Sequence, residues 1–119
     1  MRTWILLAAV NGFIAVAAGA FATHALTARL DAHMLDVFQT GARYQMYHAL
    51  ALGLIGILPP GKHLNCAGWC FTLGIFLFSG SLYALALTGV TWLGAITPFG
   101  GGLFLVGWVL LGVSALKRS

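Results

Sequence analysis

The sequence predicts an all-α membrane protein: a bundle of four transmembrane helices, with a short interfacial helix between the first and second spans. Apolar residues make up 61% of the 119-residue chain and charged residues only 7%, whereas about a quarter of the residues of a soluble domain are charged. The apolar residues fall into four stretches, and a helix needs roughly 20 residues to cross the hydrocarbon core. We therefore expect residues 1–119 to form a single membrane domain.

The first span is expected over residues 4–22. Gly12, Ala15 and Gly19 follow one another at spacings of three and four, which places them on one helix face. A stripe of small residues lets two membrane helices approach closely. We therefore expect this face to pack against another helix, and Asn11 to hydrogen-bond to a neighbouring helix.

The second span is expected over residues 41–58, after a more polar segment at residues 27–38. Apolar residues recur at helical spacing in that segment, so we expect a short helix lying in the membrane surface. A Pro-Pro-Gly sequence at residues 59–61 then ends the second span. The first half of this span is unusual, because it carries five polar or ionisable side chains: Arg43, Tyr44, Gln45, Tyr47 and His48.

The third and fourth spans are expected over residues 66–88 and 98–116. Gly89 is placed to end the third span, because glycine adopts the left-handed conformation that follows many helices. A threonine followed by a proline at residues 97–98 opens the fourth span. Near its start, Gly100 and Gly101 are expected to allow close contact with a neighbouring helix.

Four spans place both ends of the chain on one side of the membrane. Basic residues gather on that side, and the cytoplasmic loops of membrane proteins are the basic ones. The sequence thus predicts a multi-pass protein of the inner (plasma) membrane with both termini in the cytoplasm. The basic residues are Arg2, Lys62, Lys117 and Arg118 on the cytoplasmic side, and Arg29 and Arg43 on the other.

Ionisable groups inside a span are costly and rarely face lipid, so those of the second span need a protein interior to face. If that span enters the membrane at Gly41, a rise of about 1.5 Å per residue brings His48 about 10 Å below the outer surface. Polar residues near the outer ends of the other spans lie at a comparable depth. We therefore expect a polar cluster or ligand pocket in the outer half of the bundle, formed by Arg43, Tyr44, Tyr47, His48, Tyr83, Ser81 and His24.

Three interpretations of this cluster stay open. The first is a structural hydrogen-bond network, in which Arg43 extends toward the membrane surface or pairs with Asp36. The second is a pocket for a polar or anionic head group, a lipid or a quinone, with Arg43 as the charge partner. The third is a haem or metal held by His24 and His48. Since nothing else resembles a coordination set, we expect no metal and no cofactor.

The sequence contains no recognisable catalytic arrangement. Asp31 and Asp36 both fall in the surface segment, the chain has no Glu, and no Ser-His-acid or Cys-His set stands out. We therefore expect a non-enzymatic accessory or structural membrane protein, with no nucleic-acid partner. Its expected partners are membrane lipids and either a second copy of the chain or another membrane protein. The alternative function is a carrier or binder of a small solute, lipid or quinone.

Four stretches resemble the YgdD-like family of small membrane proteins, also called domain of unknown function 423. They are GAFATHAL (residues 19–26), FQTGARYQMYHALAL (38–52), GIFLFSGSLYALALTG (74–89) and GAITPFGGGLFLVGW (94–108). The family's usual Gly-Ala-His sequence is Ala22-Thr23-His24 here, which keeps the histidine but replaces the glycine. The resemblance covers nearly the whole chain and implies a four-span inner-membrane protein. It implies no particular activity, substrate or catalytic residue.

Overall fold

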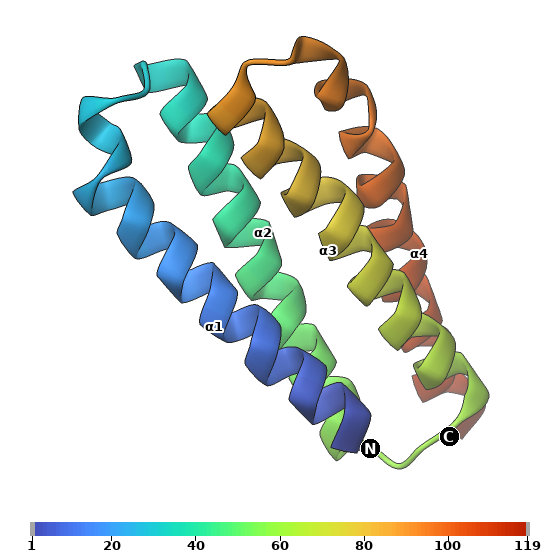
Figure 1. Ribbon diagram of the computed structural model, residues 1–119. Helices are drawn as coiled ribbons and strands as arrows, with labels where there is room; N and C mark the ends of the chain where they lie inside the picture. The colour runs from blue at the N-terminus through green and yellow to red at the C-terminus, as the bar shows by residue number, and fades with distance from the viewer. Residues whose placement is uncertain (1, 119) are drawn as a thin grey trace.

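The computed structural model describes residues 2–118, and in this part of the chain all regular structure is helical. The α-helices run up and down along the molecule, and both ends of the chain lie at the same end of the bundle (Figure 1). Short 3₁₀ helices occupy the connections at the opposite end. The elements are α1 (Arg2–His24), η1 (Leu26–Ala28), α2 (Ala32–Ile57), α3 (Lys62–Thr88), η2 (Thr91–Ala95) and α4 (Thr97–Arg118).

Three segments of the described chain are long and apolar enough to cross a membrane: α1, α3 and residues 91–117, which comprise η2 and most of α4. The expectation of helices with the length and apolar composition of membrane spans is confirmed for these three. α2 is equally long, with 26 residues or about 39 Å of helix. Its polar side chains make it less apolar than the others.

The segment expected to form a separate surface helix, residues 27–38, is divided between η1 and the start of α2. The side chain of Asp31 accepts a hydrogen bond of 2.8 Å from the backbone N–H of Met34, which caps α2 at its first turn. The helix then continues without a break to Ile57. The structure therefore corrects this expectation, since residues 32–38 and the second span form one helix.

The other helix ends follow local signals in the sequence. Gly89, with φ +73°, ends α3 in the left-handed conformation, which glycine adopts without strain. Pro98 stands in the first turn of α4, where its missing N–H leaves no helical hydrogen bond unmade. Pro59 and Pro60 lie between α2 and α3, because the residue before a proline disfavours the helical conformation.

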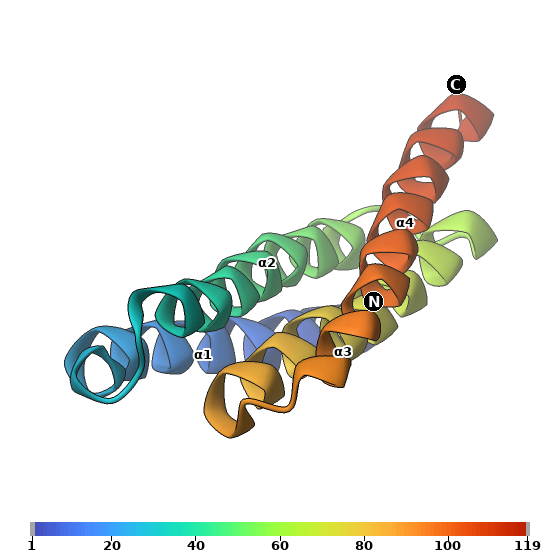
Figure 2. The same ribbon diagram turned by 90° about the horizontal axis from the view of Figure 1, so that it is seen from above.

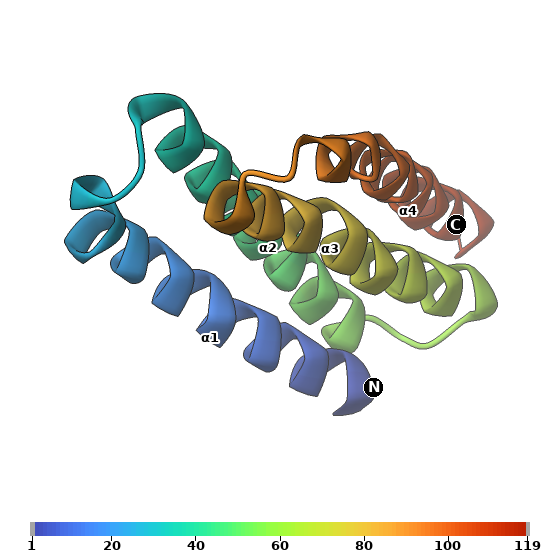
Figure 3. The same ribbon diagram turned by 45° about the horizontal axis from the view of Figure 1, so that its top comes forward.

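Helices that follow one another in the chain also pack against one another: α1 on α2, α2 on α3 and α3 on α4. α1 and α4 lie on opposite sides of the molecule, as Figures 2 and 3 show. The molecule is elongated, measuring 51 × 26 × 17 Å along its principal axes. Because α2 and α3 are central, they bury more residues than α1 does.

Glycines mark the places where helix backbones come closest. A Cβ atom on Gly100 would lie 2.4 Å from the backbone nitrogen of Phe78, so α4 lies directly against α3 there. Ala15 is buried. For Gly12 and Gly19, however, no heavy atom of the described chain lies within 4 Å of the Cβ position. These two glycines therefore differ from the expected contact stripe. Gly101 meets only the edge of the Phe78 ring, at 3.8 Å.

Candidate functional site

The polar residues of α2 point in different directions and meet different neighbours. Gln45 and His48 are both buried, at 4% exposed each. Gln45 bonds to α1 and α3, whereas His48 bonds to α4. Arg43 and Tyr47 lie on the exposed side of the helix. The side chains expected to converge are therefore divided among several places.

A chain of hydrogen bonds joins three helices through Asn11, Gln45 and Tyr83, and we call it the amide–tyrosine chain. The hydroxyl of Tyr83 on α3 donates to Oε1 of Gln45 at 2.7 Å. Nε2 of Gln45 donates to Oδ1 of Asn11 on α1 at 3.0 Å, and Nδ2 of Asn11 donates to the carbonyl oxygen of Leu7 at 2.8 Å. The expectation that Asn11 bonds to another helix is thus confirmed.

The amide–tyrosine chain lies along a groove between α1 and α3, with α2 as its floor. Its volume is about 330 Å³. At the end of the bundle that holds the chain termini, Trp4 closes the gap between α1 and α3, because its ring packs against Gly68 and its Nε1 donates to Oδ1 of Asn65 at 3.3 Å. The residues that line the groove are Asn11, Ile14, Gln45, Thr72, Ile75, Phe76, Ser79, Gly80 and Tyr83.

His48 joins α2 to α4. The indole N–H of Trp108 donates to its Nε2 at 3.1 Å, and because an indole is only a donor, that nitrogen carries no proton. The proton therefore sits on Nδ1, which donates to the carbonyl oxygen of Tyr44 at 2.7 Å. The ring stacks on Phe104 with 3.6 Å between centroids and 5° between planes. His48 thus acts as a neutral connector with both nitrogens occupied.

Arg43 and its neighbours occupy the exposed side of α2. Nη2 of Arg43 lies 3.7 Å from Oδ1 of Asp36 and donates to Oγ1 of Thr40 at 3.0 Å. The Arg43 side chain is 50% exposed, and Tyr47 is 52% exposed. Tyr44 is at the edge of this side, with its ring 4.8 Å from that of Phe78. The pairing with Asp36 is the one the structural-network interpretation anticipated, but no enclosed pocket surrounds Arg43 within the described residues.

His24 and Ser81 lie away from the other candidates. His24 is exposed at the end of α1, whereas sixteen residues, or about 24 Å of helix, separate His48 from the neighbouring start of α2 at Ala32. The two histidines therefore cannot bind one metal or haem. The Ser81 hydroxyl faces α4 and lies 2.6 Å from Oγ1 of Thr97.

The depth expected for His48 also needs correction. α2 begins at Ala32 and not at Gly41, so His48 lies sixteen residues from the start of the helix. It lies only nine residues, or about 14 Å, from the helix end at Ile57. That end of α2 is the one beside the chain termini (Figure 1). His48 thus belongs to the half of the bundle nearer the termini, and not to the opposite half.

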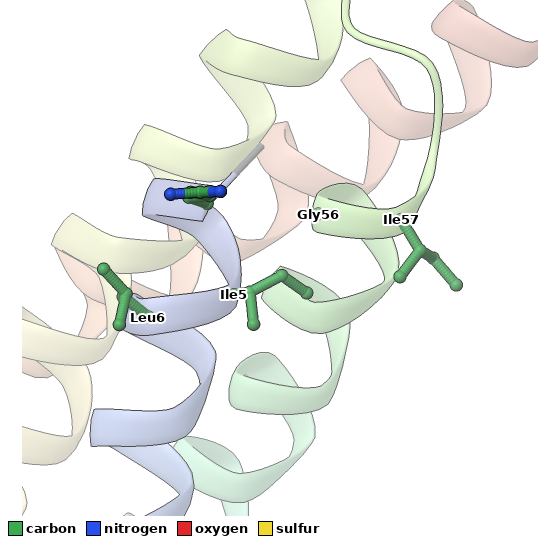
Figure 4. A pocket seen from close by; sticks show the side chains of 5 residues that line it. Ile5, Leu6, Gly56 and Ile57 are labelled. Atoms are coloured by element: carbon green, nitrogen blue, oxygen red, sulfur yellow. The ribbon is translucent and has the colours of Figure 1, made fainter.

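A wider hollow lies between α1 and α2 at the end that holds the termini (Figure 4). Its volume is about 700 Å³, and four of its lining residues are apolar or glycine: Ile5, Leu6, Gly56 and Ile57. The fifth is Arg2. The hollow therefore has a mainly apolar lining with one basic residue at its edge.

Comparison with known proteins identifies a family that matches the sequence. The matching family model is described as a protein of unknown function (DUF423) and covers residues 18–101. A UPF0382 membrane protein of Staphylococcus aureus (strain bovine RF122) is 44% identical over 119 residues, or 98% of each chain. The UPF0382 membrane protein YwdK of Bacillus subtilis is 42% identical over 121 residues, again 98% of each. No solved structure matches the chain.

Proposed function

The chain belongs to the DUF423 family, whose relatives are described as membrane proteins, and on this premise we propose a non-enzymatic accessory role in the inner membrane. The resemblance noted in the sequence is thereby confirmed. In the proposed role, the protein crosses the membrane four times and keeps both termini in the cytoplasm. It binds a helix of a partner protein through the exposed side of α2.

The exposed side of α2 has the residue spacing of a helix–helix seam. Its residues alternate at intervals of four and three, which is the spacing that keeps one face of a helix against another helix. We call these residues the α2 seam. They are Asp36, Thr40, Arg43, Tyr47, Leu50, Leu54 and Ile57, of which all but Thr40 are exposed.

The observation that carries the proposal is the placement of Arg43. It lies eleven residues into α2, or about 17 Å from the start of the helix, with its side chain half-exposed. An arginine inside a span is costly, and the cost reaches about 2.5–3.5 kcal/mol at the span centre by insertion scales. The contact with Asp36 offsets part of that cost. A partner helix over the seam would remove the remaining charged surface from lipid.

The engagement of the ionisable groups supports a role without catalysis. Both nitrogens of His48 are occupied by Tyr44 and Trp108. Asp31 caps α2, and Asp36 contacts Arg43. General acid–base catalysis needs a group that can exchange a proton with a substrate, and each of these three groups already has a partner within the protein.

Site-specific photo-crosslinking in native membranes tests the α2 seam. A benzoylphenylalanine replaces Leu50 in the seam, and a matched control replaces Leu105 on α4; these leucines are 67% and 70% exposed. We expect a covalent protein adduct at position 50 and none at position 105. An adduct of twice the monomer mass identifies a second copy, and any other mass identifies a different protein.

The additional substitution Arg43→Ala should lower the yield of the position-50 adduct, because it removes the charged group that the partner covers. Equal adduct yields at positions 50 and 105, or no adduct at position 50, would contradict the proposal.

The second candidate function is a binder of a lipid or quinone. The groove beside the amide–tyrosine chain favours it.

A further inference from the structure

We propose that the groove between α1 and α3 is a binding site for a neutral amphiphile, an apolar molecule that carries a carbonyl or hydroxyl oxygen. This inference is independent of the α2 seam. The groove and the seam lie on different sides of α2, because Gln45 faces the groove while Arg43 and Tyr47 are exposed on the seam.

The groove is built into the bundle. Trp4 holds α1 and α3 together at the end beside the termini, because a Cβ atom on Gly68 would lie 2.6 Å from its ring. Beyond that point the two helices separate, and Gln45 of α2 forms the floor between them. The resulting volume of about 330 Å³ falls at the lower end of the range of small-molecule sites.

The hydrogen bonds of the amide–tyrosine chain determine what the groove can offer to a ligand. Tyr83 donates its only hydroxyl proton to Gln45, so its oxygen remains an acceptor. Gln45 and Asn11 each use one amide hydrogen, and each amide has a second. A carbonyl oxygen can accept from these hydrogens, and a hydroxyl can both accept from them and donate to Tyr83.

The rest of the lining selects a neutral and mainly apolar ligand. None of the described lining residues is charged, and a charged group without a partner is costly inside a membrane. Ile75 forms a buried wall. Ile14 and Phe76, 43% and 74% exposed, form the rims on α1 and α3. Between these rims a ligand can enter sideways from the lipid.

A quinone and an alcohol with the same apolar tail represent the two oxygen groups that this chemistry allows. The probes are a menaquinone with a four-isoprene tail and geranylgeraniol, which carries the same tail on a hydroxyl group. Each is titrated into the full-length protein in detergent, and native mass spectrometry counts the bound molecules. We expect one molecule per protomer for at least one probe.

A groove-filling variant separates this site from unspecific partitioning. Gly80 lines the groove, and outside its own helix backbone no heavy atom of the described chain lies within 4 Å of a Cβ atom built on it. Gly80→Leu therefore adds a bulky side chain to the groove wall without displacing a neighbouring helix. The matched control is Gly102→Leu on α4, where the Cβ position is equally free of described neighbours. We expect at least tenfold weaker binding in Gly80→Leu and unchanged binding in Gly102→Leu.

A further variant tests the hydrogen-bonding chemistry. Tyr83→Phe removes the hydroxyl, and we expect geranylgeraniol to bind roughly 2–10-fold more weakly, the effect of one hydrogen bond.

Should Gly80→Leu fail to fold, Ile14→Trp fills the groove from the rim on α1 instead. Loss of either probe in the filled variants supports the site, and the probe that binds identifies the oxygen group. Absence of binding to both, or equal binding in wild type and filled variants, would overturn it.

Discussion

His48 shows how a single histidine can connect two membrane helices without carrying a charge. Its Nε2 accepts from Trp108 of α4, its Nδ1–H donates within α2, and its ring stacks on Phe104. A buried polar group is tolerated in lipid when its hydrogen bonds are made inside the protein. These contacts favour a structural role for His48, so we expect its removal to lower the stability of the protein.

We expect His48→Ala to lower the free energy of unfolding by about 2–4 kcal/mol. The substitution leaves a cavity beside Phe104 and deprives the indole N–H of Trp108 of its acceptor. The control is His33→Ala, because His33 is an exposed histidine of the same helix. Unfolding in a mixed-detergent titration measures both. A His48→Ala protein as stable as the His33→Ala protein would show that the connection contributes little.

The polar residues of the second span could be predicted as a group, but their individual neighbours could not. A helix turns once in 3.6 residues, so Arg43, Gln45 and His48 face three directions. Which helix each one meets depends on the order in which the helices pack. A signal for the amide–tyrosine chain was nevertheless present, because Asn11 and Gln45 are amides within or beside apolar spans.

At the scale of the helices, α2 is the element that the sequence described least well. Its polar beginning has the composition of a membrane-surface segment. For that reason alone the sequence predicts two helices where the structure has one. Asp31 was the sequence signal for the true start of α2, because an aspartate before a helical pattern is a strong N-cap. The helix that it caps is continuous through Gly41.

Glycine spacing predicted close helix contact at several positions, and the structure distinguishes among them. Spacing identifies residues that share a helix face, but it does not reveal whether another helix covers that face. Gly100 lies against the backbone of α3. Gly12 and Gly19 have no described neighbours at the same range, although Ala15 of the same stripe is buried. α1 also contacts α2 outside the stripe, where Ile5 lies against Gly56.

This difference predicts opposite effects for two substitutions in one helix. We expect Gly100→Ala to lower the free energy of unfolding by about 1–3 kcal/mol, because its Cβ atom would lie 2.4 Å from backbone that must shift. Gly102→Ala should be neutral or stabilise by up to about 1 kcal/mol, the ordinary gain of alanine over glycine in a helix. Detergent titration of both proteins measures the difference. If both substitutions change the free energy of unfolding equally, α3 and α4 do not approach as closely as the structure shows.

For the whole molecule, hydrophobic stretches and their Gly and Pro boundaries were sufficient to predict the four long α-helices of the described chain, but not that residues 32–38 belong to the second of them. They were not sufficient to predict that α1 and α4 lie on opposite sides. Contacts between distant segments depend on side-chain fit, and this fit has no periodic signature in the sequence. Four crossings and a cytoplasmic position for both termini remain predictions, because α2 is less apolar than its neighbours.

Cysteine labelling can test the crossing of α2 directly. In a chain in which Cys66 and Cys70 are replaced by alanine, single cysteines are placed at three exposed positions: Thr27, Lys62 and Thr91. These positions lie before α2, after α2 and after α3. A membrane-impermeant maleimide applied to intact spheroplasts reports the residues on the outer side, and permeabilised cells show that each cysteine can react.

If α2 crosses the membrane, Lys62 lies on the opposite side from Thr27 and Thr91. The basic residues near the chain termini and at Lys62 predict that this side faces the cytoplasm. We therefore expect Thr27→Cys and Thr91→Cys to react from outside, and Lys62→Cys only after permeabilisation. The inverse pattern would preserve four crossings but reverse their orientation. Equal labelling at positions 27 and 62 would mean that α2 stays on one side. Arg43 would then lie in water and the α2 seam would lose its reason to bind a membrane helix.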